Sequence, residues 1–521
     1  MEKLSIILCN KSRREVLQAL AYGSVSLAGG MFPSPATAAT ETPKYGGHIR
    51  VASLSISISD TLDPARGTLS TDYMRQYMIF NGLTSYNEAL GADLALAERI
   101  ETDDNKRWII YLRNDVVFHG GKSLHADDVV FSLMRHKDPQ TASIVNGIAA
   151  QFETIRVKGA LEVEINLVSP NADLPVILAD SHFLIVPSGT TNFNKVSGTG
   201  PYRIKEFNPG VNTVVVRNEN YWKNGKPYLD EIELIGIPDE TSRVNALLAG
   251  DIHLTLAVNP RSEKRIRQSG THSLLATPSG LYTSLIMSQR GEPTNNPDFV
   301  MAMKYMFDRK LIRRALFRNF AEIANDHPIQ PGHKYYMSDL PQRSYDPDKA
   351  RFHLKKAGMI GVRIPVYASP AAEGSVDMGS ILQETSARVG LKLAVNRVPA
   401  DGYWSNHWMK HPLGFGNTNA RPTADMIFSQ FYKSDAPWNE SGWHNEQFDQ
   451  LLLLARAESE EMKRRQMYGD MQQLIHKHCG VSIPVFINLI DAFDNRIKGL
   501  GAIPTGGLMG YSFAEHVWLN G

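Results

Sequence analysis

Residues 108–122 read Trp-Ile-Ile-Tyr-Leu-Arg-Asn-Asp-Val-Val-Phe-His-Gly-Gly-Lys and carry the clearest fold signal in the chain. The first six are rich in β-branched and aromatic side chains, which favours a β-strand. Similar runs occur at 161–168 and 213–217, and the former alternates apolar and polar residues as a half-buried strand does. We expect strands at all three places.

Helix-like segments alternate with these strands. Residues 346–358 begin with an Asp-Pro pair suited to an N-cap and first helical position, and they end on a glycine. Apolar residues mostly three to four apart predict a helix over 298–318, and 446–478 predicts two helices with a break near Ser459. This alternation predicts an α/β or α+β chain.

Length and composition exclude several classes of protein. A chain of 521 residues suggests about three domains, and 42% hydrophobic with 21% charged residues excludes whole-chain disorder and a polytopic membrane protein. Lys and Arg (55) balance Asp and Glu (54), so nucleic acid is not an expected partner. The two cysteines, Cys9 and Cys479, exclude a disulfide scaffold and a Cys-rich zinc site.

The N-terminal residues have the pattern of an export signal. Arg13 and Arg14 precede the uncharged stretch 16–32, and small residues follow at 36–39. We expect a twin-arginine type signal peptide over 1–39, cleaved near Ala38, and export to the periplasm. The alternative is a membrane anchor, for which the weakly apolar stretch is short.

The sequence contains no positive sign of catalysis. It lacks a Gly-x-Ser-x-Gly elbow, a phosphate loop and a His-Glu-x-x-His pair. The segment 197–202, Ser-Gly-Thr-Gly-Pro-Tyr, precedes a strand-like run rather than a helix, so it predicts a tight turn. We therefore expect a protein that is not an enzyme and has no cofactor.

His407 and His411 are spaced i, i+4, which on a helix places both imidazoles on one face, as a metal site needs. No acidic residue lies between them, and Pro412 follows directly. The competing interpretation is a pair of surface or packing histidines.

One region has the composition of a recognition surface. Residues 415–422 are rich in Gly and Asn, and aromatic residues flank them, as in many small-molecule pockets. The alternative is that these aromatic residues fill the core. The wider segment 404–443, which contains residues 415–422, holds four of the seven tryptophans: Trp404, Trp408, Trp438 and Trp443.

A series of short motifs occurs in a familiar order. They are 46–52 (Gly-Gly-His-Ile-Arg-Val-Ala), 61–64 (Thr-Leu-Asp-Pro), 80–83 (Phe-Asn-Gly-Leu), 108–122, 126–132 (Ala-Asp-Asp-Val-Val-Phe-Ser), 198–202, 220–222 (Asn-Tyr-Trp), 248–252 (Leu-Ala-Gly-Asp-Ile), 448–452 (Phe-Asp-Gln-Leu-Leu) and 483–484 (Ile-Pro). Because these motifs occur in the order found in that family, the chain resembles the extracytoplasmic solute-binding proteins of ABC importers, the peptide/nickel/opine-binding family (family 5).

The resemblance implies an α/β bilobal periplasmic binding protein, type II-like, with an extra inserted domain. Lobe I would comprise 40–87, 188–285 and 490–521, the extra domain 88–187, and lobe II 286–489. Two chain crossings would form the hinge, and solute would close the cleft.

The resemblance also implies where the solute binds. In peptide binders a strand of lobe II reads Gly-Trp-x-x-Asp, and 414–418 occupies that register with Phe415 as aromatic wall and Thr418 in place of the acid. The candidate ligand contacts are Thr68, Leu69, Ser70, Trp404, Phe415, Gly416, Asn417, Thr418, Arg421 and Trp438.

These residues lead to a hypothesis about charge. A neutral Thr418 serves an ammonium group poorly, whereas the planar fork of Arg421 suits a carboxylate or phosphate. We expect an anionic or neutral polar solute rather than a cationic head. Two alternatives are that Arg421 faces solvent or pairs with Asp425, or that Asp425 itself replaces the missing acid.

The expected function is that of a monomeric periplasmic receptor. It would capture a peptide-like or other small polar solute and deliver it to an ABC permease at the inner membrane. The alternative within the family is a nickel or metal-chelate binder that uses His407 and His411, and from another class a secreted hydrolase.

Overall fold

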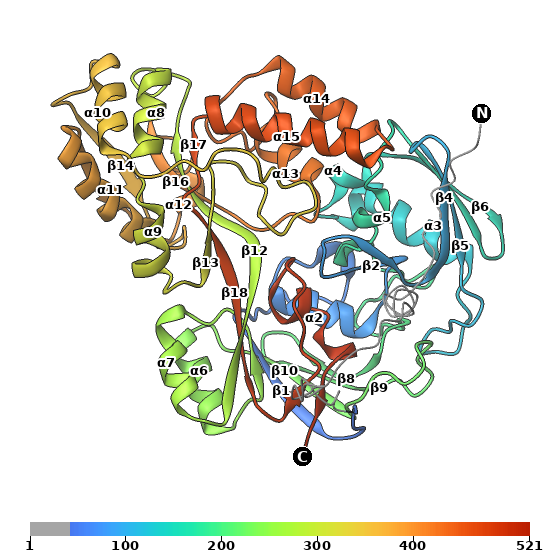
Figure 1. Ribbon diagram of the computed structural model, residues 1–521. Coiled ribbons are helices and arrows are strands. Elements are labelled where there is room, and N and C mark those ends of the chain that lie inside the picture. Colours follow the sequence, from blue (N-terminus) through green and yellow to red (C-terminus); the bar gives the residue numbers. More distant parts are fainter. Residues whose placement is uncertain (1–41) are drawn as a thin grey trace, which may run out of the picture.

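The computed structural model of the protein describes residues 42–521, which form two lobes and an additional domain (Figure 1). The expected signal peptide, residues 1–39, lies outside the described residues. Across residues 42–521, no helix has both the length and the apolar character needed to cross a bilayer. The arrangement confirms the predicted α/β class.

One sheet of 12 strands runs through both lobes, in the order β15-β14-β16-β12-β18-β11-β1-β10-β9-β8, with β13 and β17 paired beside it. The strands are β1 (His48–Ser53), β8 (Tyr202–Asn208), β9 (Asn212–Arg217), β10 (Glu231–Gly236), β11 (Leu254–Thr255), β12 (His272–Met287), β13 (Ala321–Ile323), β14 (Arg363–Ala368), β15 (Lys392–Arg397), β16 (Leu413–Thr418), β17 (Val481–Ser482) and β18 (Val485–Asp494).

The first lobe, at the bottom of Figure 1, contains β1 and β8–β11. Apolar residues of β1 and β10, such as Ile49, Val51 and Ile232, form its core with the C-terminal segment. Its helices are α2 (Ser70–Ile79), α6 (Glu240–Ala249), α7 (Glu263–Gln268) and α16 (Gly507–Gly510), and the short strands β19 (Ile497–Lys498) and β20 (Trp518–Leu519) pair near the C-terminus.

The second lobe, at the top of Figure 1, contains β13–β17. Two separate hydrophobic clusters pack against its strands, one around Phe299 and Phe415 and the other around Phe428 and Tyr468. Its helices are α8 (Pro297–Tyr305), α9 (Arg309–Leu311), α10 (Pro347–Lys356), α11 (Ser375–Val389), α12 (Tyr403–Asn406), α13 (Ala424–Phe431), α14 (Glu446–Ala457) and α15 (Glu461–His478).

Strands β12 and β18 cross from one lobe to the other side by side. Their pairing shifts between Thr277 and Leu281, so that residues 278–280 of β12 lie opposite the single residue Asn488 of β18. Residues 278–280 read Pro-Ser-Gly, which suits a bulge because proline is confined to such positions inside a sheet. The irregularity lies where the two lobes meet.

The additional domain, on the right of Figure 1, has a sheet of four antiparallel strands in the order β4-β5-β7-β6 and its own core. Trp108 and Ile110 of the stretch at 108–122 lie in that core. Its elements are β4 (Ala97–Thr102), β5 (Arg107–Leu112), β6 (Phe152–Gly159), β7 (Glu162–Leu167), α3 (Ala126–Met134), α4 (Asn146–Ala149) and α5 (Leu174–Ile177); the hairpin of β2 (Thr84–Tyr86) and β3 (Ala92–Leu94) precedes it. The residue boundaries expected for the three parts stay a prediction.

Most predicted elements are present, and one differs. The strands expected at 108–113, 161–168 and 213–217 are β5, β7 and β9, and α14 and α15 are separated around Ser459. The helix expected over 298–318 is instead interrupted after α8, because Asp308 starts a new turn by accepting a hydrogen bond from the amide of Leu311 (2.9 Å).

Candidate functional site

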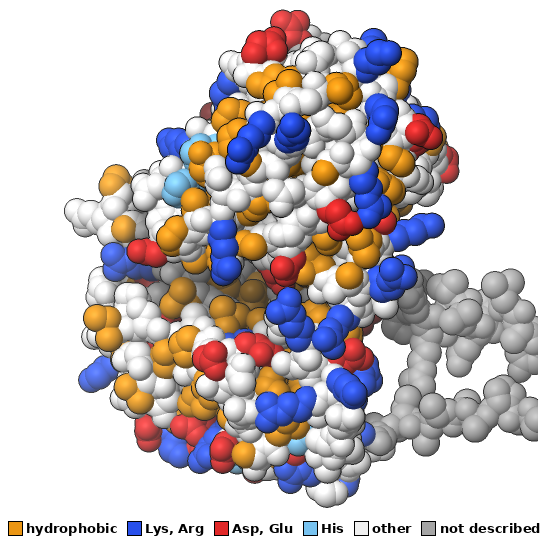
Figure 2. Space-filling view, turned by 90° about the vertical axis from the view of Figure 1, so that its left-hand side faces the viewer, with side chains coloured by type: hydrophobic (Ala, Val, Ile, Leu, Met, Phe, Trp, Pro, Cys, Tyr) orange, Lys and Arg blue, Asp and Glu red, His pale blue; other side chains and the backbone are white. Residues whose placement is uncertain are grey.

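The two lobes enclose a cleft beside the crossing strands. Figure 2 shows a hollow between the lobes on the side of the molecule that carries α6, α7 and α11. At the crossing strands there is a cavity of about 320 Å³, which we call the hinge pocket. Its lining comes from both lobes and includes Val258, Leu281, Glu373, Ile487 and Tyr511. A mostly apolar cavity with a few polar groups is the usual form of a small-molecule site.

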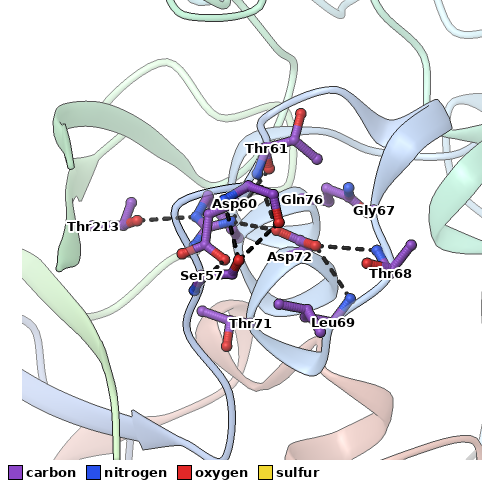
Figure 3. Close-up of polar contacts among 12 residues, drawn as sticks. Ser57, Asp60, Thr61, Gly67, Thr68, Leu69, Thr71, Asp72, Gln76 and Thr213 are labelled. Atoms are coloured by element: carbon purple, nitrogen blue, oxygen red, sulfur yellow. Dashed lines mark hydrogen bonds and ion pairs between the residues drawn. The ribbon is translucent and has the colours of Figure 1, made fainter. Parts of the chain in front are cut away.

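The loop with Thr68, Leu69 and Ser70 lies at the start of α2 (Figure 3). Asp72 holds this loop, because one of its carboxylate oxygens accepts hydrogen bonds from the amides of Thr68 (3.0 Å) and Leu69 (3.1 Å). The loop is solvent-accessible: Thr68 is exposed, and Leu69 and Ser70 are half-buried. Its conformation is therefore fixed while its side chains stay available.

Arg75 in turn fixes Asp72 from the buried side. Its guanidinium donates to Asp72 (2.8 Å), to Asp60 (3.2 Å) and to the hydroxyl of Thr213 (2.9 Å). Burial lowers the pKa of Arg75, and the two carboxylates oppose that effect. Two carboxylates around one buried guanidinium make a satisfied network.

A second anchor of the same loop starts at Asp180, which follows α5. The Nδ1 atom of His182 is 2.5 Å from Asp180 Oδ1, and its Nε2 atom is 3.0 Å from the carbonyl oxygen of Gly67. Neither a carboxylate nor a carbonyl can donate, so both ring nitrogens carry hydrogen and His182 is an imidazolium. Burial lowers the pKa of His182, but the charge and hydrogen bond of Asp180 together with the carbonyl oxygen of Gly67 and the charge of Asp72 raise it, and the net shift is upward.

Arg421 extends from the end of β16 into the cleft. Its Nε donates to Gln430 (2.7 Å), and Nη1 lies near the carbonyl oxygens of Asn419 and Ala420, which leaves Nη2 without a hydrogen-bond partner among residues 42–521. Burial lowers its pKa, while Tyr282, and across the cleft Asp180, Tyr73 and Tyr86, favour the charge. Arg421 therefore faces the first lobe and the additional domain with one free donor group.

Asp425 does not pair with Arg421. It is buried and accepts a hydrogen bond from Arg456 (2.9 Å) inside the second lobe. Burial raises the pKa of Asp425 despite that partner. The two alternatives in which Asp425 neutralises Arg421 or replaces the missing acid do not fit this arrangement.

Strand β16 lies between β12 and β14, and its side chains face the interior. Phe415 is fully buried in the core of the second lobe, and Thr418 is 2% exposed. Asn417 donates to the hydroxyl of Thr283 (2.9 Å), and a Cβ on Gly416 would lie 2.1 Å from Glu440. The aromatic wall expected at Phe415 is thus absent from the accessible surface here, because Phe415 packs into the hydrophobic cluster around Phe299.

Trp404 and Trp438 are each 42% exposed. Trp438 lies 5.4 Å, centre to centre, from the ring of Phe431, over which the guanidinium of Arg421 is placed at 5.6 Å. Trp404 instead packs at the edge of Trp408 (5.8 Å). Trp438 is therefore connected to the cleft through Phe431, and no comparable contact connects Trp404 within the described chain.

His407 and His411 contact one another, with Nδ1 of the first 3.1 Å from Nε2 of the second. Tyr367 stacks on His411 at 3.5 Å. Within residues 42–521 no group of three or more His, Cys, Asp or Glu side chains is placed to hold a metal ion. The metal-ligand role of this pair stays a prediction.

The sequence-based reasoning missed several residues around the cleft: Tyr73, Tyr86 and Asp180 near Arg421, His182 beside Asp180, and Glu373 in the hinge pocket. Asp180 and His182 lie in Ala-Asp-Ser-His, which resembles an ordinary helix cap, and Glu373 lies in the loop before α11. No local pattern distinguishes them, since the lobes bring them together from distant parts of the chain.

Comparisons with known proteins agree with this architecture. Residues 92–440 match the model of the family described as "Bacterial extracellular solute-binding proteins, family 5 Middle". The chain is 24% identical over 476 residues to the glutathione-binding protein GsiB of Salmonella choleraesuis, an alignment that covers 87% of this chain and 92% of that protein.

Solved structures that share the fold include two with bound ligands. The periplasmic binding protein DppA of Helicobacter pylori, in complex with the peptide STSA, gives a TM-score of 0.76 at 20% identity over 92% of this chain and 99% of its own. NikZ of Campylobacter jejuni, in complex with Ni(L-His), gives 0.75 at 21% identity over 90% and 99%. With the matched segment covering most of its length, the chain belongs to the bacterial extracellular solute-binding proteins of family 5.

Proposed function

We propose that this protein is the extracytoplasmic receptor of an ABC importer. It captures a peptide-like or other small polar solute between its lobes and delivers it to a permease at the inner membrane, as a monomer, without catalysis. Export by a twin-arginine signal cleaved near Ala38 belongs to the same proposal. The family membership and the cleft between two lobes support it.

The free side of the Arg421 guanidinium is the observation that supports a prediction about the charge of the solute. A guanidinium with no acidic partner within hydrogen-bond distance faces the cleft, and Asp425 is occupied by Arg456. A carboxylate or phosphate of the solute would supply the missing acceptor. We therefore infer that the solute presents an anionic group to Arg421.

The test begins with mass spectrometry of the compound that co-purifies with the protein and is released by denaturation. Calorimetric titration with that compound should show about ten- to a hundredfold weaker binding to Arg421→Gln, because a charge-assisted contact contributes about 1.5–3 kcal/mol. Arg388→Gln, an exposed arginine on α11 paired with Glu384, is the matched control. Equal affinity of the Arg421 variant and wild type would remove the anion-binding role.

A further inference from the structure

The hinge pocket contains a carboxylate without a partner. Glu373 lines the pocket from the loop before α11, and its side chain forms no hydrogen bond or ion pair with any residue of the described chain, 42–521. The Glu373 side chain is exposed to solvent, yet many protein atoms lie around it, as expected for a residue in the wall of a cleft. Burial raises the pKa of this carboxyl, and no positive charge opposes the shift.

The backbone of Glu373 is fixed. The hydroxyl of Thr283, on crossing strand β12, donates to the Glu373 carbonyl oxygen (2.6 Å). Gly374 follows with φ of 69° and begins α11, a conformation that glycine adopts without strain. The carboxylate is therefore held at the pocket by a defined loop, and its free side does not result from a loose segment.

The neighbouring cations are already engaged. Arg243 donates to the carbonyl oxygens of Ile237 (2.8 Å) and Ala257 (3.0 Å), and Arg261 pairs with Asp377 at the rim (3.4 Å). Neither guanidinium lines the hinge pocket.

The charged side chains that line the pocket, Glu373 and Glu240, are both acidic, and its other polar residues, Asn259, Asn488 and Tyr511, are neutral. One oxygen of Glu240 accepts from the amide of Asn259 (3.1 Å), and Asn488 has a buried side-chain oxygen with no hydrogen-bond partner in the described chain. The remaining lining is largely apolar, with Leu281 and Ile490 from the crossing strands. A group that donates hydrogen bonds and carries positive charge fits this lining, and an anion does not.

We propose that the hinge pocket binds a cationic group on an apolar stem, with Glu373 as its counter-ion. This rests on the proposed receptor function and extends it. Gly280 lines the small cavity that contains Arg421, and its neighbour Leu281 lines the hinge pocket, so the two sites adjoin along β12. The solute then carries an anionic group for Arg421 and a cationic group for Glu373.

The test uses three small probes of similar shape: butylammonium, butanol and butanoate. Their affinities for the full mature chain are measured by NMR titration. Butylammonium should bind about tenfold more tightly than butanol, since a charged hydrogen bond is added to the same apolar contact. Glu373→Gln should remove that preference, whereas Glu384→Gln, the same charge change on the exposed face of α11, should retain it.

A second measurement follows the Glu373 carboxyl itself. Its NMR titration should give a pKa above 4.5 in the free protein and a lower value with butylammonium bound, and butylammonium affinity should rise as pH increases through that range. Equal binding of butylammonium and butanol, or a preference that survives Glu373→Gln, would overturn the proposal.

These outcomes are independent of the anion site. Arg421→Gln should leave the preference for butylammonium unchanged, because Arg421 lines a different cavity. If Arg421→Gln binds the co-purified solute as tightly as wild type does, the anion-binding role of Arg421 is wrong, while the result for Glu373 is unaffected.

Discussion

Asp173 of the additional domain and Arg464 of the second lobe form a buried ion pair at 2.8 Å, 291 residues apart in the chain. Close by, the side-chain amide of Asn105 donates to the hydroxyl of Ser459 (2.7 Å), and the backbone amide of Ala172 donates to the carbonyl oxygen of Arg456 (3.0 Å). These contacts join the additional domain to α14, α15 and the loop between them. The second lobe is thus held both by the crossing strands and by this contact.

Breaking this ion pair should favour separation of the lobes. Asp173→Asn leaves Arg464 buried without a counter-charge, which costs about 3–5 kcal/mol as long as the arginine stays buried. The cost is smaller in an arrangement in which the arginine reaches water, so that arrangement is favoured. Small-angle scattering without solute should give a larger radius of gyration, and solute affinity should fall.

The matched control for this variant is Asp377→Asn. It breaks the pair with Arg261, whose side chains are 68% and 55% exposed, so neither quantity should change measurably. An unchanged radius for Asp173→Asn would show that the ion pair does not hold the lobes together.

His182 should make stability depend on pH. Its pKa is raised above 6.5 in the folded protein because Asp180, the carbonyl oxygen of Gly67 and Asp72 together outweigh burial. The stabilisation is therefore complete at pH below the unfolded pKa, and it is lost as pH rises through the folded pKa. Urea unfolding at about pH 6 and about pH 9 should show wild type losing more free energy of unfolding over that interval than His182→Gln.

Asp180→Asn tests the same interaction from the other side. It removes the charge that raises the pKa of His182, so it should reduce the pH dependence as well. The same dependence in all three proteins would be inconsistent with a charged His182.

Glu515 should contribute to resistance against acid. Burial opposes its charge, but Lys223 and Lys226 lower its pKa from 4.5 to about 2. The stabilisation of the folded protein by Glu515 is present above pH 4.5 and is lost as pH falls through about 2. Glu515→Gln should lower the free energy of unfolding by about 3 kcal/mol at neutral pH, and by progressively less as pH falls. Glu384→Gln, which is exposed, should change it by about 0.5 kcal/mol or less.

Gly416 and Gly414 form a test of packing within β16. A Cβ on Gly416 would lie 2.1 Å from Glu440 Oε1, and that oxygen is held by the indole N–H of Trp408 (2.8 Å). Gly416→Ala should therefore cost about 1–3 kcal/mol in urea unfolding. Gly414→Ala meets nothing closer than 3.8 Å and should be nearly neutral, and equal costs would contradict this account.

Much of the fold was predictable from local pattern. Trp108 to Leu112 form a strand because β-branched and aromatic side chains suit a pleated surface, and Asp346 caps α10 as its sequence position indicates. The break before α9 was not predicted, because a cap at Asp308 inside an apolar period resembles an ordinary helical residue.

The site was less accessible to the same reasoning. Arg421 was expected as a contact for an anionic solute, and its Nη2 has no hydrogen-bond partner among residues 42–521, so that role stays a prediction. Phe415 and Thr418 were expected to line the solute site but lie in the interior, and Phe415 packs there against residues far away in sequence. The roles of Asp180 and Glu373 could not be predicted, because they depend on residues that are distant in sequence and that the fold brings close to them.

The bulge in β12 has a consequence for how such a receptor changes over evolutionary time. Because residues 278–280 face one residue of β18, the strands can bend there while the paired residues on either side stay hydrogen-bonded. Bending at this point would therefore break few backbone hydrogen bonds. Substitutions in the cleft walls can therefore alter which solute is captured without redesign of the moving part, so one scaffold can acquire new cargoes by changes in a few side chains.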